Sequence, residues 1–307
     1  MKVALAAVLA YIVFYGASVA VLARDPHLEA GETLGVLLVF GLGFSFVAWL
    51  ATRGATPRRL RVRSPGREMA WLALLLVGIG VGFLGPGLTA VRAAVPTEPS
   101  QSIALLAAKL VVLVVLPALV FRWLGYTWRE LFAFASLDRV ERRALVILMA
   151  ATALLQGTVG RGPRAIAALM AERGLPAWEL GLVALPVWAW LTLEAGLTEE
   201  FLFRVLLQSR LAAWLKSETA GVIGMALLFG LAHAPGYVLR GAHVAEGMTG
   251  APSALSAVAY ATVVVSPLGL MFGVLWARTR NLALVVVLHG FADLIPNLAP
   301  MIRAFSG

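Results

Sequence analysis

Long apolar runs separated by short polar segments make up most of this chain of 307 residues. An apolar run of about 20 residues has the length of a helix that crosses a bilayer core of roughly 30 Å. The run 180–215 is too long for one ordinary crossing, so it predicts either one helix that continues past the bilayer edge or two helical pieces. The predicted spans are 3–23, 33–52, 69–88, 103–121, 143–159, 180–215, 219–234, 254–276 and 282–299.

This pattern predicts an all-α fold, a polytopic transmembrane helical bundle of eight or nine spans. A backbone in lipid must satisfy its own hydrogen bonds, and a helix does so within one segment. A membrane β-barrel would show alternating apolar and polar residues, which these runs do not show. Composition agrees, because 61% of the residues are hydrophobic and 13% are charged, about half the charged share of a typical soluble domain.

The net charge of +9 comes from arginines that gather between the predicted spans, in segments 53–67, 122–142 and 278–280. Counting the spans alternately puts all three segments on one side, which the positive-inside rule identifies as cytoplasmic. The charge therefore needs no nucleic-acid partner. We expect an integral protein of the bacterial inner (plasma) membrane, surrounded by membrane lipid. Cysteine is absent, which excludes a disulfide framework, a thiolate metal site and a cysteine nucleophile.

Ionisable side chains deep in the apolar runs predict a functional site, because burying a charge in a bilayer costs several kcal/mol. We find them in three of the last four spans. They are Glu194, Glu199, Glu200, Arg204, His233, His289 and Asp293.

The spacing of these residues predicts how they are grouped. Glu200 and Arg204 are four residues apart, so they share a helix face and can form a pair. Glu199 is rotated by about 100° from Glu200, which leaves it available as a general base. His289 and Asp293 are also four residues apart and share a face.

The distances of Glu200 and His233 from a common turn predict that their side chains lie at the same depth in the membrane. Glu200 lies sixteen residues before Lys216, and His233 lies seventeen residues after it. If the two helices form an antiparallel hairpin that turns at Lys216, both side chains lie at one level, roughly 25 Å from the turn. That level is in the half of the bilayer away from the arginine segments, so the site is expected to open on the non-cytoplasmic face.

Several alternatives stay open for individual residues. The carboxylates and imidazoles could activate water without a cofactor, or they could bind a divalent metal such as zinc through Glu199, His233 and His289. We interpret Glu194 as a structural or interface residue. His243 and Glu246 lie in the Gly-rich segment 235–253 and are interpreted as solvated loop residues.

Three motifs occur in order along the chain: Glu199-Glu200-(x3)-Arg204, Phe229-(x3)-His233 and His289-(x3)-Asp293. This ordered set resembles the CPBP family, also called the Abi family, which comprises type II CAAX prenyl endopeptidases and bacteriocin-processing enzymes. The resemblance covers roughly 180–300. It divides the chain into N-terminal transmembrane helices without a clear motif, 1–142, and a CPBP-like catalytic membrane domain, 143–307.

The resemblance implies an intramembrane endopeptidase of the glutamic or metallo type. It would act on a membrane-associated protein or peptide in CAAX-type (prenyl protein), sorting-signal or peptide-maturation processing. Glu199 and His233 would activate the water, and His289 and Asp293 would stabilise the oxyanion. Glu200 and Arg204 would hold the geometry of the site, supported by Phe229.

Where many members have Asn, this chain has Asp293, and a carboxylate is a poor oxyanion donor unless protonated, so Asp293 is instead a candidate to orient His289. Two other classes of function remain. One is a polytopic transporter, which would also keep ionisable groups at depth. The other is a non-catalytic scaffold or immunity protein.

Overall fold

All regular secondary structure in the computed structural model is helical, within the residues that it describes: 1–25, 33–160, 162–240 and 250–305. The α-helices are α1 Lys2–Leu22, α2 Thr33–Val36, α3 Ser45–Ala51, α4 Pro65–Gly78, α5 Leu88–Ala94, α6 Ser100–Lys109, α7 Leu116–Trp123, α8 Trp128–Leu131, α9 Arg139–Val159, α10 Gly162–Arg173, α11 Ala177–Leu191, α12 Thr198–Glu200, α13 Ser209–Leu215, α14 Glu218–Arg240, α15 Ala254–Tyr260, α16 Ser266–Thr279, α17 Leu282–Ala292 and α18 Leu294–Phe305.

Wider, π-helical turns join many of these α-helices end to end. They are η2 Leu37–Phe44, η3 Ile79–Gly87, η4 Leu110–Val115, η5 Thr192–Leu197, η6 Phe201–Gln208 and η7 Ala261–Val265. Short π-helical segments occur often at functional sites. Two of them, η5 and η6, flank the pair Glu199-Glu200.

Six of the described helices are long and apolar enough to cross a membrane, and the number rises to eight if each of two bent helix pairs is one span. The six are Lys2–Leu22, Pro65–Ala94, Ser100–Trp123, Ala177–Leu215, Glu218–Leu239 and Ala254–Thr279. The all-α membrane fold is confirmed, whereas a count of eight or nine spans is not. The predicted span 33–52 contains a shorter apolar helix, Leu37–Ala51.

Segment 180–215 is part of one continuous helix of 39 residues, Ala177–Leu215. At 1.5 Å per residue it is roughly 58 Å long, almost twice the thickness of a bilayer core. Of the two predicted possibilities, the structure therefore has the single helix that continues past the bilayer edge.

Other helix boundaries differ from the sequence-based prediction. The segment 282–299 is not one straight span, because α17 and α18 meet at Asp293 with a bend of 67°. The segments 160–179 and 235–253, which lie between predicted spans, are partly helical, since α10 lies in the first and α14 continues through Pro235 into the second. His243 and Glu246 lie outside the described residues.

Contacts along the chain define two compact units. Unit 1 comprises Met1–Leu88 and Phe203–Arg280, and unit 2 comprises Thr89–Leu202 and Asn281–Gly307. The predicted division into 1–142 and 143–307 concerns the location of the motifs, and it stays a prediction.

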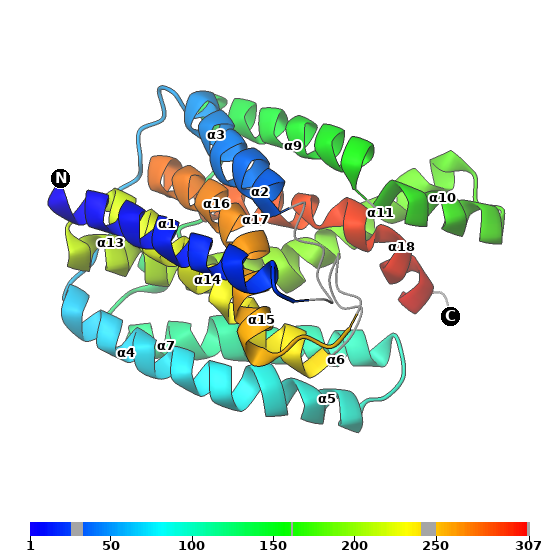
Figure 1. The fold of residues 1–307 in the computed structure, drawn as a ribbon, viewed down its shortest axis with the longest axis horizontal. Helices are drawn as coiled ribbons and strands as arrows, with labels where there is room; N and C mark the ends of the chain where they lie inside the picture. Colours follow the sequence, from blue (N-terminus) through cyan, green and yellow to red (C-terminus); the bar gives the residue numbers. More distant parts are fainter. Residues whose placement is uncertain (26–32, 161, 241–249, 306–307) are drawn as a thin grey trace. The chain divides into compact units, whose positions relative to one another are not determined.

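Unit 1 contains the turn of the predicted hairpin and the two helices next to the turn, where α14 packs against α13, and also against α16 and α1 (Figure 1). Its turn lies at Lys216, which has a left-handed backbone with φ of 52°. Arg204 lies twelve residues before this turn, and Phe229 lies thirteen after it. The guanidinium of Arg204 is 4.9 Å from the centre of the Phe229 ring. Residues equidistant from Lys216 therefore meet at one level within unit 1.

Arginines and their partners join the helix ends of unit 1. Arg58 donates to the carbonyl oxygen of Thr279 at 3.2 Å, and Arg278 donates to the carbonyl oxygen of Thr52 at 3.1 Å. The segment 53–67 and the turn 278–280 thus share one end of the unit, as the topology prediction requires. Burial is the main cause that lowers the pKa of Arg280 from its usual value.

In unit 2, η5 and α17 approach each other closely. Two glycines at this contact have no side chain, so the backbones of the two helices touch. A Cβ atom on Gly196 would lie 2.5 Å from the carbonyl oxygen of Val286. A Cβ atom on Gly290 would lie 2.6 Å from the Cα atom of Thr192. Small residues let membrane helices pack backbone to backbone, and here they bring the segment before Glu199 against the helix of His289.

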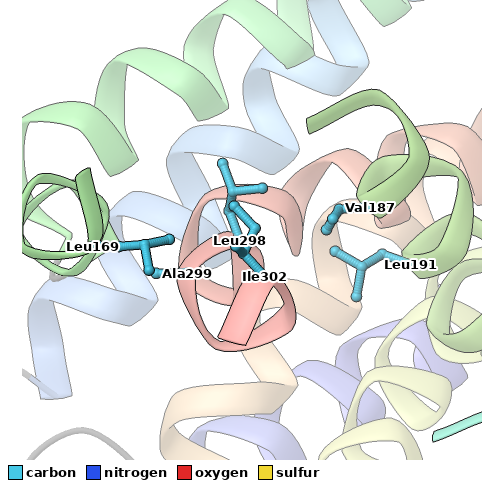
Figure 2. Close-up of a cluster of buried hydrophobic side chains, with 6 residues drawn as sticks. All are labelled: Leu169, Val187, Leu191, Leu298, Ala299 and Ile302. Atoms are coloured by element: carbon cyan, nitrogen blue, oxygen red, sulfur yellow. The ribbon is translucent and has the colours of Figure 1, made fainter. Parts of the chain in front are cut away.

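The short helix α18 is anchored by a buried apolar cluster in unit 2. Figure 2 shows Leu298, Ala299 and Ile302 of α18 between Leu169 of α10 and the pair Val187 and Leu191 of α11. This packing holds α18 after the bend and therefore helps to fix the position of Asp293.

We expect Gly290→Ala to lower the stability of the protein by about 1–3 kcal/mol, because the added methyl group overpacks a backbone contact. Gly181→Ala is the matched control, since no atom lies within 4 Å of a Cβ at this position on α11. The measurement is thermal unfolding of the purified variants in detergent. Equal transition temperatures for the two variants would contradict the close approach.

Candidate active site

Unit 2 gathers three of the predicted site residues around the imidazole ring of a fourth, His289. The Nδ1 atom of His289 lies 2.8 Å from Oε1 of Glu200. Its Nε2 atom lies 3.8 Å from Oε2 of Glu199 and 3.7 Å from Oδ2 of Asp293. Helix α12 and the residue that follows α17 thus contribute three carboxylates to the surroundings of one histidine.

The two adjacent glutamates have different environments, as their helical rotation predicts. The side chain of Glu200 is fully buried, whereas the side chain of Glu199 is 20% exposed. A carboxylate must accept hydrogen bonds when buried, and His289 supplies one to Glu200. The partly exposed Glu199 is the carboxylate that a water molecule can reach.

Glu200 orients His289, a role that the sequence analysis considered for Asp293. A carboxylate accepts, so the 2.8 Å contact requires a proton on Nδ1 of His289. The 3.7 Å separation between Nε2 and Asp293 is longer than a hydrogen bond. Asp293 is the residue that follows α17, and its backbone N–H donates to the carbonyl oxygen of His289 at 3.1 Å.

Neighbouring helices of unit 2 hold α17 by its own backbone. Gln156 of α9 donates to the carbonyl oxygen of Ala292 at 2.6 Å, one residue before Asp293. Trp188 of α11 donates from its indole nitrogen to the carbonyl oxygen of Val287 at 3.2 Å. These bonds fix the helix that carries His289 from two sides.

Unit 1 carries the other predicted site residues, His233, Phe229 and Arg204. The Nδ1 atom of His233 lies 2.8 Å from the carbonyl oxygen of Phe229. Since a carbonyl oxygen only accepts, Nδ1 carries the proton, and Nε2 of the neutral ring is an acceptor. Arg204 is fully buried and lies over the ring of Phe229, so Phe229 links the arginine to the histidine within this unit.

No three His, Asp or Glu side chains among the described residues have an arrangement that could hold a metal ion. The ligand set proposed from the sequence, Glu199, His233 and His289, draws on both units, so it stays an alternative.

Lys109 is an ionisable residue of unit 2 that the sequence analysis missed. It lies inside the predicted span 103–121, so ionisable residues within the apolar runs are not confined to three of the last four spans. Its Nζ atom is 2.6 Å from Oε1 of Glu194. Glu194 therefore has an ion-pair partner within the unit, and the lone lysine in an apolar run was the signal that could have identified it.

The fold and this cluster define a polytopic helical membrane protein with a candidate acid–base site. Residues 181–295 match the family model of type II CAAX prenyl endopeptidase Rce1-like proteins. The match agrees with the family resemblance of the motifs, over the part of the chain that contains all three of them. It supports a protease, hence a hydrolase, that is integral to a membrane. No curated protein and no solved structure matched the chain.

We expect Glu200→Ala to destabilise the protein by about 1–3 kcal/mol, because it leaves Nδ1 of the buried His289 without this acceptor. Glu199→Ala is the matched control, since Glu199 lies 3.8 Å from the ring, beyond hydrogen-bond distance, and is partly exposed. Thermal unfolding in detergent measures both. A loss for Glu199→Ala as large as that for Glu200→Ala would argue against the orienting bond.

We expect Lys109→Met and Glu194→Gln each to destabilise the protein by roughly 1–3 kcal/mol, and the double variant to lose less than the sum, because each single change leaves one charge uncompensated in apolar surroundings. A double-mutant cycle of unfolding free energies gives the coupling. The control cycle uses Glu172 and Arg303, an exposed pair in the same unit. Coupling in the Lys109 cycle no larger than in the control would reject the pair as a stabilising contact.

Proposed function

We propose that this protein is an intramembrane endopeptidase that hydrolyses a peptide bond of a membrane-associated protein or peptide by a glutamate- and histidine-activated water. The observation that carries the proposal is the cluster of Glu199, Glu200 and Asp293 around His289. The family match over 181–295 supports it, because the match spans this cluster and His233.

In the proposed reaction Glu199 is the general base. It removes a proton from the water while the water oxygen attacks the carbonyl carbon of the scissile bond. The family resemblance gives His233 a share in activating the same water, and this role stays a prediction. When the tetrahedral intermediate collapses, the C–N bond breaks and Glu199 returns the proton to the leaving amine. The products are a carboxylic acid and an amine, which balances the addition of one water.

His289 supplies the oxyanion donor in this proposal. Its Nδ1–H is committed to Glu200, so only Nε2 can face the developing negative charge. A neutral ring with its proton on Nδ1 has a lone pair at Nε2, and this lone pair would repel an oxyanion. The role therefore requires the imidazolium form of His289, with Glu200 as its fixed partner.

Asp293 has a different role from the one that Asn would have at this position. An ionised carboxylate cannot donate to an oxyanion, but its charge 3.7 Å from Nε2 favours the imidazolium form that the proposal needs. We therefore assign Asp293 to electrostatic support of His289. The face on which the site opens stays a prediction, with the non-cytoplasmic face favoured by the arginine segments.

The experiment that tests this proposal is cleavage of prenylated CAAX-type and unprenylated membrane-anchored peptides by the purified protein in proteoliposomes. We expect Glu199→Gln to lower kcat by about 10²–10⁴-fold, because it removes the general base. Glu172→Gln, an exposed glutamate of the same unit, is the matched control and should retain activity. Parallel reactions with a chelator distinguish the metal-free route from a metal-dependent one.

Two results would contradict the proposal. One is peptide cleavage that persists in Glu199→Gln, which would remove Glu199 as the base. The other is solute flux through the proteoliposomes without cleavage of any peptide, which would favour a transporter.

A further inference from the structure

An apolar groove of about 540 Å³ lies in unit 1, away from the motif residues. Helices α1, α14 and α16 and the segment η2 form its walls. Neither Arg204, Phe229 nor His233 contributes to its lining. The apolar part of the lining includes Val8, Ile12, Leu42, Val222, Leu270 and Val274.

The open side of this groove is itself apolar. Val8, Ile12 and Leu42 belong both to the lining and to the exposed large hydrophobic residues of the protein. In a chain with membrane-spanning helices such residues face lipid rather than water. From Leu270 to Arg278 the α16 wall is about 12 Å long, which accommodates part of one extended hydrocarbon chain.

One end of the groove is charged. Arg278 belongs to the lining and donates to the hydroxyl and carbonyl oxygens of Thr52 at 3.3 and 3.1 Å. Both acceptors are neutral, so these bonds position the guanidinium without cancelling its charge. Glu218 also belongs to the lining, but its carboxylate is bound by Arg280 at 2.5 and 2.6 Å. The charge of Glu218 is therefore offset within its own ion pair.

Further arginines surround the same end. Arg58 donates to the carbonyl oxygen of Thr279, the residue after Arg278. Arg53 follows Thr52 in the chain, and its guanidinium lies 4.5 Å from the centre of the Trp49 ring. Segment 53–67, which contains Arg53 and Arg58, has six arginines and no acidic residue. The groove thus runs from an apolar wall to a positively charged end.

We propose that this groove binds one anionic phospholipid, with an acyl chain along the apolar wall and the phosphate at Arg278. The positive charge at the Arg278 end of the groove favours an anionic headgroup, since basic pockets between membrane helices bind anionic lipid headgroups. The exposed apolar side of the groove accommodates the acyl chain, because a lipid can enter the groove laterally from the bilayer. This site is separate from the proposed peptidase chemistry and does not depend on it.

Native mass spectrometry of the full-length protein, released from detergent with phosphatidylglycerol or phosphatidylcholine, tests the proposal. We expect the wild type to retain one phosphatidylglycerol in preference to phosphatidylcholine. Arg278→Gln should lower the apparent affinity for phosphatidylglycerol about fivefold, the effect of one basic residue on an anionic lipid. Arg303→Gln, an exposed arginine of unit 2, is the matched control and should not change it.

Two more variants separate the headgroup from the chain. Arg278→Lys keeps the charge and should keep the preference for phosphatidylglycerol. Val274→Trp fills the groove and should lower retention of both lipids, while Arg278 stays in place. Equal retention of the two lipids by the wild type, or equal losses in Arg278→Gln and Arg303→Gln, would overturn the proposal. Unchanged lipid retention in Val274→Trp would also overturn the proposal, because the acyl chain of the lipid would then lie outside this groove.

Discussion

The hydrogen bond between Glu200 and His289 is the interaction on which the candidate site of unit 2 depends. It joins a fully buried carboxylate to a buried imidazole at 2.8 Å. The bond is possible because Gly196 and Gly290 allow η5 and α17 to approach through their backbones. It selects one protonated nitrogen of His289, and thereby determines which ring atom can serve chemistry.

Much of the fold could be predicted because the bilayer imposes one length on many helices. A single polar break in an apolar run predicts the hairpin turn at Lys216. The contact of Arg204 with Phe229 agrees with a turn at this position, because the two residues are about equally far from Lys216 in the sequence. The bend at Asp293 has a signal in the sequence that the predicted span 282–299 did not use, because Pro296 has no N–H to donate to the carbonyl oxygen of Ala292, four residues earlier. Tertiary contacts add to this local cause: Gln156 donates to that carbonyl oxygen, and α18 buries Leu298 and Ile302 against other helices of unit 2.

The site shows a similar division between local and tertiary information. The pairing of His289 with Asp293 was predicted from a spacing of four residues, which places two side chains on one face. The partner of His289 is nevertheless Glu200, from a helix 89 residues earlier. Likewise, Lys109 and Glu194 are 85 residues apart, and a spacing rule for one helix cannot find such pairs. The lone lysine in an apolar run was visible, but its partner was not.

Two helices of unit 1 end at a cation, and these cations bear on how the protein is oriented in the membrane. Lys216 and Arg280 both have left-handed backbones, with φ of 52° and 50°, where glycine would avoid a strain of roughly 1–2 kcal/mol. Each instead places a cation at a helix C-terminus, where it complements the helix dipole. Because cations resist translocation through a membrane, the same two side chains favour keeping both corners on the cytoplasmic side, and this sidedness stays a prediction.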